Sequence, residues 1–313
     1  MKPLKSILLY ADRTSSPDAA LRRAEALAAT NKARLCVVDV LPGRDRPWLT
    51  VGGYPEPQQS VVTARLRELD LLVAPACRRG LSVRVQVLIG RPFVELIRDV
   101  LRKGHDLVVL NAETEDGRPE QLFGRTDLHL LRDCPCPVWV IKRDEYGPHR
   151  QILAAVDAGE DWSEQQQESV RVLELSASVA ESDGSELQIV YCLGHWTSNN
   201  SAGWLENALG RHRHRLDELL AKCDLSRVRH DVRLERAAAV DVIAALRVDV
   251  DVLVMGTVWR SGPAGVLIGD TAQDALARVS CSVLAVKPEG FITPVRSNER
   301  PSLWSSVVTW RAA

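Results

Sequence analysis

Residues 6–12, with the sequence SILLYAD, decide the fold, because the same pattern returns at residues 151–157 as QILAAVD. Each stretch is a short apolar run that ends in an aspartate, and the two aspartates, Asp12 and Asp157, lie 145 residues apart. Further identical residues keep this spacing: Asp106 and Asp251, Gly124 and Gly269, Thr126 and Thr271, Leu131 and Leu276, Cys136 and Cys281, Lys142 and Lys287. Because so many matches at one spacing exclude chance, the chain is a tandem duplication.

The duplication predicts the domain organisation. A chain of 313 residues is long enough for two domains of roughly 150 residues each. We place the first domain at 1–143, the second at 150–292 and a C-terminal tail at 293–313. The segment between the domains, RDEYGPHR, is polar and contains Gly and Pro, so we interpret it as a linker.

Within each copy, strand patterns alternate with helix patterns. In the first copy the predicted strands are 6–11, 34–40, 82–88, 106–110 and 137–142, and the predicted helices are 18–29, 59–78, 92–103 and 125–133. The later runs, such as 107–110 and 252–255, are apolar without alternation, which is typical of parallel strands covered on both faces. We therefore predict an α/β fold in which each copy is a doubly wound, five-stranded parallel sheet with about four helices.

Composition and charge exclude several classes of protein. The chain is 45% hydrophobic and 26% charged, as in ordinary globular proteins. Its 40 basic and 41 acidic residues give a net charge of −1, which argues against binding to nucleic acid or to an anionic membrane. The basic run at 211–215 would spread around a helix rather than line one face. We interpret it as solvated surface.

The sequence favours a cytoplasmic protein. The apolar run near the N-terminus is too short for a signal peptide, and no stretch reaches the ~20 apolar residues that a membrane span needs. The seven cysteines are odd in number and scattered, and several lie in apolar runs, which fits a reducing compartment.

Candidate site residues follow from the topology. In an open parallel sheet, ligands bind beyond the carboxyl ends of the strands, where the strand order reverses. Asp12 and Asp157 follow the first strand of each copy, and polar or glycine-containing stretches follow the fourth strand. Gly124 and Gly269 stand at predicted helix starts, where free N–H groups favour an anion.

Several motifs together resemble the universal stress protein family. They are the apolar strand ending in Asp12, the sequence Gly90-Arg91-Pro92 before the third helix, and the loop and helix that lead to PCPVWVIK at 135–142. In the second copy, residues 254–291 resemble the closing segment of the tandem-domain members. The resemblance implies a Rossmann-like fold of the adenine nucleotide alpha hydrolase type, dimer-like packing of domains and, in many members, ATP binding.

The resemblance also implies a binding loop that can be compared position by position. In ATP-binding members the first-strand aspartate contacts the adenine side, and a G-x2-G-x9-G-[ST] loop holds the ribose and phosphates. In the first copy these four positions are Asn111, Thr114, Gly124 and Arg125, and in the second copy they are Gly256, Trp259, Gly269 and Asp270. The second copy keeps two glycines, and Thr271 follows directly.

The substitutions in these loops change the chemistry. Thr114 is β-branched and adopts positive φ poorly, and Trp259 brings an indole where binders have no side chain. Asp270 can cap its own helix and would repel a phosphate, whereas Arg125 would attract one. Each candidate also has a structural reading: Asp12 and Asp157 as turn residues, Gly124 and Gly269 as loop residues, and Arg125 and Arg260 as surface residues.

Motifs of dedicated enzymes and metal sites are missing from the sequence. It contains no G-x-S-x-G, no Walker A loop and no G-x-G-x-x-G. Cys134 and Cys136 lack the two-residue spacing of redox or zinc pairs, and His212 and His214 would diverge on a helix. We therefore expect no metal and no dedicated enzyme. A slow ATPase is a minor alternative that predicts turnover lost in Asp157→Ala.

The sequence thus predicts a cytoplasmic tandem universal stress protein with a regulatory or protective role. ATP or another adenine nucleotide would bind the second copy through Asp157, Gly256, Thr257, Arg260, Gly269, Asp270 and Thr271. A second site would comprise Asp12, Asn111, Gly124, Arg125 and Thr126. The alternative is a scaffold or small-molecule sensor without nucleotide. Expected partners are the two copies themselves, as an intramolecular pseudo-dimer, with a homodimer optional and neither nucleic acid nor membrane.

Overall fold

The structure is a computed structural model, and its two compact units are described one after the other. It describes residues 4–13, 18–42, 50–51, 54–55, 58–112, 123–142, 149–157, 162–192, 202–237, 239–246, 250–260, 266–268, 279, 281–296 and 307–310. One compact unit contains Pro3–Pro119, Phe123–Asp144 and Ile292–Ala313, and the other is mainly Glu145–Phe291. The last residues of the chain thus belong to the N-terminal unit.

The N-terminal unit is built on five parallel strands. They are β1 (Ser6–Tyr10), β2 (Arg34–Leu41), β5 (Val83–Ile89), β6 (Leu107–Asn111) and β7 (Val138–Ile141), and they lie in the order β7-β6-β1-β2-β5. Strand order reverses between β1 and β6, which confirms the predicted doubly wound sheet. Residues of β1, β6 and β7 are buried throughout, as expected for strands covered on both faces.

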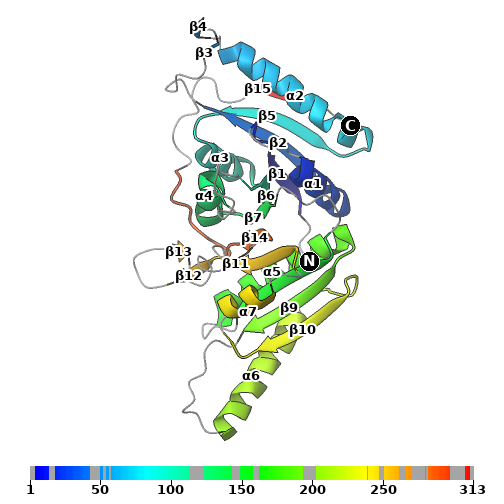
Figure 1. Cartoon of the computed structure of the whole chain (residues 1–313), viewed down its shortest axis with the longest axis vertical. Coiled ribbons are helices and arrows are strands. Elements are labelled where there is room, and N and C mark those ends of the chain that lie inside the picture. The colour runs from blue at the N-terminus through cyan, green and yellow to red at the C-terminus, as the bar shows by residue number, and fades with distance from the viewer. Residues whose placement is uncertain are drawn as a thin grey trace. The chain divides into compact units, whose positions relative to one another are not determined.

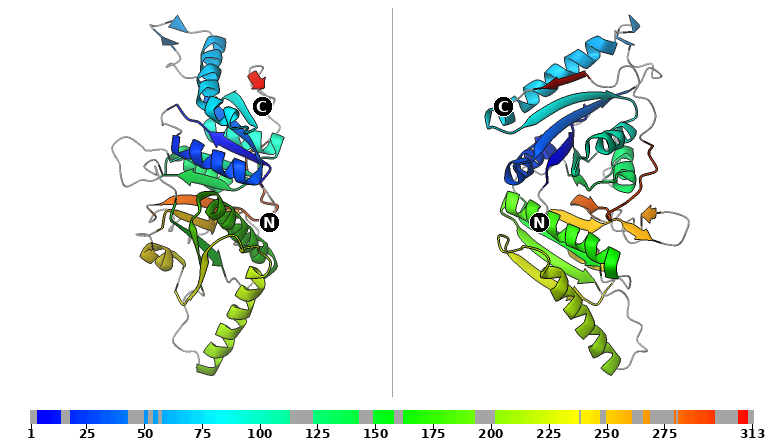
Figure 2. Two further views of the ribbon diagram at one scale, coloured as in Figure 1. Left: turned by 90° about the vertical axis from the view of Figure 1, so that its right-hand side faces the viewer. Right: turned by 180° about the vertical axis from the view of Figure 1, so that it is seen from behind.

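Four helices accompany this sheet: α1 (Asp18–Asn31), α2 (Gln58–Arg78), α3 (Pro92–Lys103) and α4 (Arg125–Asp133). Helix α1 lies on one face of the sheet, and α3 and α4 lie together on the other (Figures 1 and 2). The ends of α3 follow from its sequence. Pro92 stands in the first turn, where no backbone hydrogen bond is lost, and Gly104 adopts the left-handed conformation (φ 66°) and donates to the Val100 carbonyl.

The C-terminal unit repeats the same topology. Its strands are β8 (Gln151–Asp157), β9 (Glu186–Cys192), β10 (His230–Glu235), β11 (Val252–Gly256) and β14 (Ser282–Val286), in the order β10-β9-β8-β11-β14. Its described helices are α5 (Trp162–Asp183), α6 (Ala202–Leu220) and α7 (Ala239–Leu246). The helix expected to start near Gly269 lies outside the described residues. The identical strand order confirms that the copies share one fold.

Three short features lie outside this common plan. Two antiparallel ribbons, β3 (Thr50–Val51) with β4 (Tyr54–Pro55) and β12 (Val258–Arg260) with β13 (Val266–Ile268), follow β2 and β11. The predicted tail contains a strand, β15 (Val307–Trp310), that pairs antiparallel with β5. The first sheet therefore has one strand more than the five predicted. Within the described part of the chain, none of the helices is long and apolar enough to cross a membrane.

Candidate functional site

The carboxyl ends of β1 and β2 in the N-terminal unit are joined by Arg65 of α2. Its guanidinium donates to Asp39 Oδ2 at 2.6 Å and to the Ala11 carbonyl at 2.8 Å. Asp39 is 1% exposed. Burial raises the pKa of Asp39, Arg65 opposes this rise, and the nearby carboxylate of Asp12 adds to it. Arg65 therefore places a cation at the carbonyl of Ala11, the residue before Asp12, on the side where an adenine was expected.

Asn111 ends β6 and caps the neighbouring helix. Its Oδ1 accepts a hydrogen bond of 3.0 Å from the backbone N–H of Ala20, near the start of α1, and its side chain is buried. The first N–H groups of a helix have no partner within the helix, so this bond supplies one. The structure thus gives Asn111 a structural task at the position where binders carry the first loop glycine.

The start of α4 already holds a carboxylate of the chain. The N–H of Gly124 donates to Asp127 Oδ2 at 3.0 Å, and Asp127 is fully buried. Thr126 is buried beside it, and Arg125 is exposed. A helix start favours one negative charge through its free N–H groups. Because Asp127 provides that charge, a phosphate at this place would meet repulsion.

In the C-terminal unit, Gly256 ends β11 below a side chain of α5. A methyl group at this glycine would lie 2.5 Å from Glu168 Oε1, closer than van der Waals contact permits. The absence of a side chain at Gly256 therefore lets the Glu168 carboxylate approach the strand. This packing is a reason for glycine that does not involve a ligand.

Lys287 is the site residue that the sequence reasoning missed. It follows β14, is 1% exposed, and its ammonium donates to the hydroxyl of Thr257, which is itself fully buried. The Thr257 hydroxyl lies 3.3 Å from the Val286 carbonyl, and the ammonium also lies 5.3 Å from the centre of the Phe291 ring. Lys287 directly follows a buried strand, at the carboxyl ends of the strands where ligands bind, and this position could have identified it as a site residue from the sequence.

Other predicted residues of the second copy are described only in part. Asp157 is the last residue of β8 and pairs through its backbone with Cys192 of β9. The backbone of Arg260 lies in β12, where neighbouring Trp259 pairs with Leu267. Gly269, Asp270 and Thr271 lie outside the described residues. The structure therefore brings together Gly256 and Thr257, with Lys287 and Glu168 beside them.

Comparison with known proteins agrees with this architecture. The model of the universal stress protein family matches the chain twice, at residues 3–142 and 148–287. Universal stress protein E of Escherichia coli K12 is 24% identical over 254 residues, which cover 77% of this chain and 80% of the relative. Universal stress protein E of Photorhabdus laumondii is 22% identical over 313 residues, covering 95% of this chain and 99% of the relative.

Solved structures give the same fold. A protein of Pseudomonas aeruginosa UCBPP-PA14 that is assigned to the universal stress proteins aligns with a TM-score of 0.69 at 22% identity, covering 91% of this chain and 94% of that chain. A universal stress protein from Archaeoglobus fulgidus aligns with a TM-score of 0.61 at 17% identity, covering 90% and 98%. At such identities the solved structures support the fold of this chain but give no information about its ligand. With two family matches and the same strand order in both units, the chain belongs to the universal stress protein family as a tandem of two family domains.

Proposed function

We propose that this stress-response protein acts in the cytoplasm in a regulatory or protective role, and that its C-terminal domain binds ATP or another adenine nucleotide. The observation that carries the proposal is the contrast between the two domains. In the N-terminal domain, Arg65, Asn111 and Asp127 make internal hydrogen bonds near the positions at which the family resemblance would place a nucleotide. In the C-terminal domain, the same end of the strands carries the hydroxyl of Thr257 and the ammonium of Lys287, a buried pair whose mutual hydrogen bond a nucleotide would have to displace.

The proposed roles follow from position along the chain. Asp157 would face the adenine, and Gly256 and Thr257 would lie near the sugar. The phosphate side would comprise Arg260, Gly269, Asp270 and Thr271. Lys287 would add a positive charge at the carboxyl ends of these strands, which favours a phosphate. By the same reasoning, Asp12, Gly124, Arg125 and Thr126 of the N-terminal domain are not proposed to hold a nucleotide.

The duplication provides a matched pair of variants for the test. Asp157→Asn removes the charge at the proposed adenine side, and Asp12→Asn makes the same change 145 residues earlier in the other domain. A hydrogen bond to a charged group contributes roughly 1.5–3 kcal/mol, so we expect Asp157→Asn to weaken ATP binding at least about tenfold. Asp12→Asn should bind like the unchanged chain. Titration calorimetry of the full chain measures both.

Two results would reject nucleotide binding in the C-terminal domain. One is no heat of binding at millimolar ATP, and the other is equal weakening by Asp12→Asn and Asp157→Asn.

The pairing of β12 with β13 favours a second candidate function. It commits backbone groups around Trp259 to strand pairing, whereas a phosphate-binding loop needs free N–H groups. The alternative is therefore a scaffold or sensor of another small molecule. Denaturing the purified protein and analysing the released compounds by mass spectrometry separates the two: a nucleotide supports the first proposal, and a different ligand supports the second.

We also propose that the two domains pair with each other as a pseudo-dimer. The support is that both carry the same strand order and belong to one family, while a single chain supplies both. Light scattering over a range of concentrations checks this proposal. A constant monomer mass is expected if the two domains satisfy each other within one chain, and a mass that rises to a dimer would mean that pairing also occurs between chains.

A further inference from the structure

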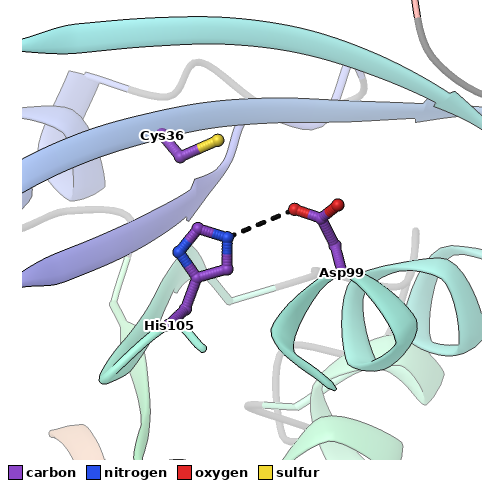
Figure 3. Close-up of side chains that lie close together, drawn as sticks. All are labelled: Cys36, Asp99 and His105. Atoms are coloured by element: carbon purple, nitrogen blue, oxygen red, sulfur yellow. Dashed lines mark hydrogen bonds and ion pairs between the residues drawn. The ribbon is translucent and has the colours of Figure 1, made fainter. Parts of the chain in front are cut away.

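A cluster of buried side chains lies at the amino ends of the strands of the N-terminal sheet, opposite the carboxyl ends of the same strands. Cys36 is near the start of β2, Asp99 is on α3, and His105 follows the glycine that ends α3 and precedes β6. The thiol, one carboxylate oxygen and one ring nitrogen all lie within 4.8 Å of one another. Figure 3 shows the three side chains converging beneath the sheet. All three residues are buried.

The donor set matches what a transition metal prefers. A thiolate, an imidazole and a carboxylate together are typical ligands of Zn²⁺, and all three groups can approach it from different elements. Bonds of ~2.0–2.3 Å to a tetrahedral zinc separate the ligand atoms by about 3.5 Å. His105 Nε2 and Asp99 Oδ2 are already 3.2 Å apart. Coordination therefore requires a modest approach of the Cys36 thiol and the departure of Lys103, whose ammonium lies 2.9 Å from Asp99 Oδ2.

The surroundings of His105 are those of a metal ligand. Its Nδ1 lies 2.8 Å from the hydroxyl of Ser6, at the start of β1. In the metal-free protein Nε2 donates to Asp99 Oδ2 at 3.2 Å, because a carboxylate oxygen can only accept. A metal at Nε2 displaces that proton, and the neutral ring then carries its proton on Nδ1 and donates it to Ser6. Such an outer partner fixes the tautomer and orientation of a ligating imidazole.

In the metal-free protein, the ammonium of Lys103 lies beside the Asp99 carboxylate. This ammonium lies 2.8 Å from Asp99 Oδ1 and also donates to Gln86, and the Lys103 side chain is 26% exposed. Arg102 is a more distant cation, 3.6 Å from the same carboxylate. Lys103 can therefore turn toward solvent. Zn²⁺ with one thiolate, one carboxylate and a neutral imidazole then forms a site without net charge, which suits burial.

The second domain shows that the fold does not require this cluster. Cys36 pairs with Leu8, and the equivalent pair in the C-terminal unit is Gln188 with Leu153. The positions 145 residues after Asp99 and His105 carry Ala244 and Val250. The same strand order thus forms without any of the three side chains. A role in folding alone would not explain their assembly in one copy.

We propose that Cys36, Asp99 and His105 form a zinc site in the N-terminal domain. On binding, the Cys36 thiol loses its proton to solvent and its sulfur bonds to the metal. The metal also replaces the proton on His105 Nε2, while the neutral ring keeps one proton on Nδ1. Lys103 leaves Asp99, and a water completes the coordination. The site is separate from the proposed nucleotide site in domain and in sheet edge, so neither proposal depends on the other.

The test uses the full chain stripped of metal with a chelator and then titrated with Co²⁺, with Zn²⁺ added in competition. Coordination by Cys36 should produce a thiolate-to-cobalt charge-transfer band at one Co²⁺ per chain, and Zn²⁺ should abolish it. Cys36→Ala should lose the band and weaken binding at least about 100-fold. The control is the double variant Cys134→Ser, Cys136→Ser, which removes two thiols of the same domain that lie 3.6 Å from each other. It should bind Co²⁺ like the unchanged chain.

A second variant keeps the test valid if Cys36→Ala does not fold. Lys103→Met removes the competing cation and should strengthen Co²⁺ binding about tenfold, an effect that a purely structural network would not produce. Circular dichroism confirms that each variant is folded. The proposal is overturned by any of three results: no charge-transfer band, a band that survives in Cys36→Ala, or unchanged affinity in Lys103→Met.

Discussion

At the scale of single residues, Asp127 shows how a carboxylate of the chain itself can occupy the start of a helix. Its buried carboxylate accepts from the Gly124 N–H at the start of α4. Asp127→Ala would leave that buried N–H without its partner, which costs roughly 1–3 kcal/mol. We expect the amides at the start of α4 to exchange with solvent about 30-fold faster, the equivalent of about 2 kcal/mol. Hydrogen exchange of peptides covering 124–133, read by mass spectrometry, measures the change.

Arg125→Ala is the matched control, because Arg125 lies in the same turn but is exposed. It should leave exchange within a factor of about two, since surface substitutions usually change stability by less than 0.5 kcal/mol. If both variants accelerated exchange equally, Asp127 would have no special role at the helix start.

At the scale of elements, local signals predicted helices and strands well but not their long-range partners. Helix α3 begins and ends where predicted, because Pro92 fixes φ in the first turn and Gly104 readily adopts the left-handed conformation that ends the helix. Strand β15 was not predicted, since its four residues form a strand only through pairing with β5. The cluster of Cys36, Asp99 and His105 escaped for the same reason: its members are far apart in the sequence and form no motif.

The junction of β11 and α5 gives a prediction at this scale. Gly256→Ala would push a methyl group against the Glu168 carboxylate, the end of a flexible side chain that must move aside, so we expect a loss of about 0.5–1.5 kcal/mol in stability. Adding Glu168→Ala removes the clash and should restore much of that loss. Chemical denaturation of the single and double variants in the absence of nucleotide measures the coupling between the two positions.

Gly210 is the control for this experiment, because it lies in α6 with nothing within 4 Å of the position of an added methyl group. Gly210→Ala should stabilise the chain by up to about 1 kcal/mol, as alanine favours helix. If Gly256→Ala were equally harmless, the glycine would have no packing role. A loss seen only in nucleotide affinity would then favour a binding role.

At the scale of the whole molecule, duplication preserved the strand order while the carboxyl-edge residues diverged. Both units have the order third, second, first, fourth, fifth strand, and the spacing of 145 residues allowed the sequence to predict that the two copies share one doubly wound fold. The contacts of Arg65, Asn111 and Asp127 could not be predicted, because each joins segments far apart in the sequence or a loop to a helix start. One fold therefore supports different side-chain chemistry in its two copies.

The C-terminal strand makes the last residues of the chain part of the first domain. Pairing of Val308 with Gln86 and of Thr309 with Val85 covers the outer edge of β5, and an uncovered edge strand promotes association between molecules. A chain that ends at Arg296 lacks β15, so we expect it to self-associate and to lose hydrogen-exchange protection over residues 83–89. A chain that ends at Arg311 keeps β15 and should behave like the full chain. Light scattering and hydrogen exchange test both truncations, and a monomeric, fully protected shorter chain would mean that β15 does not shield β5 in solution.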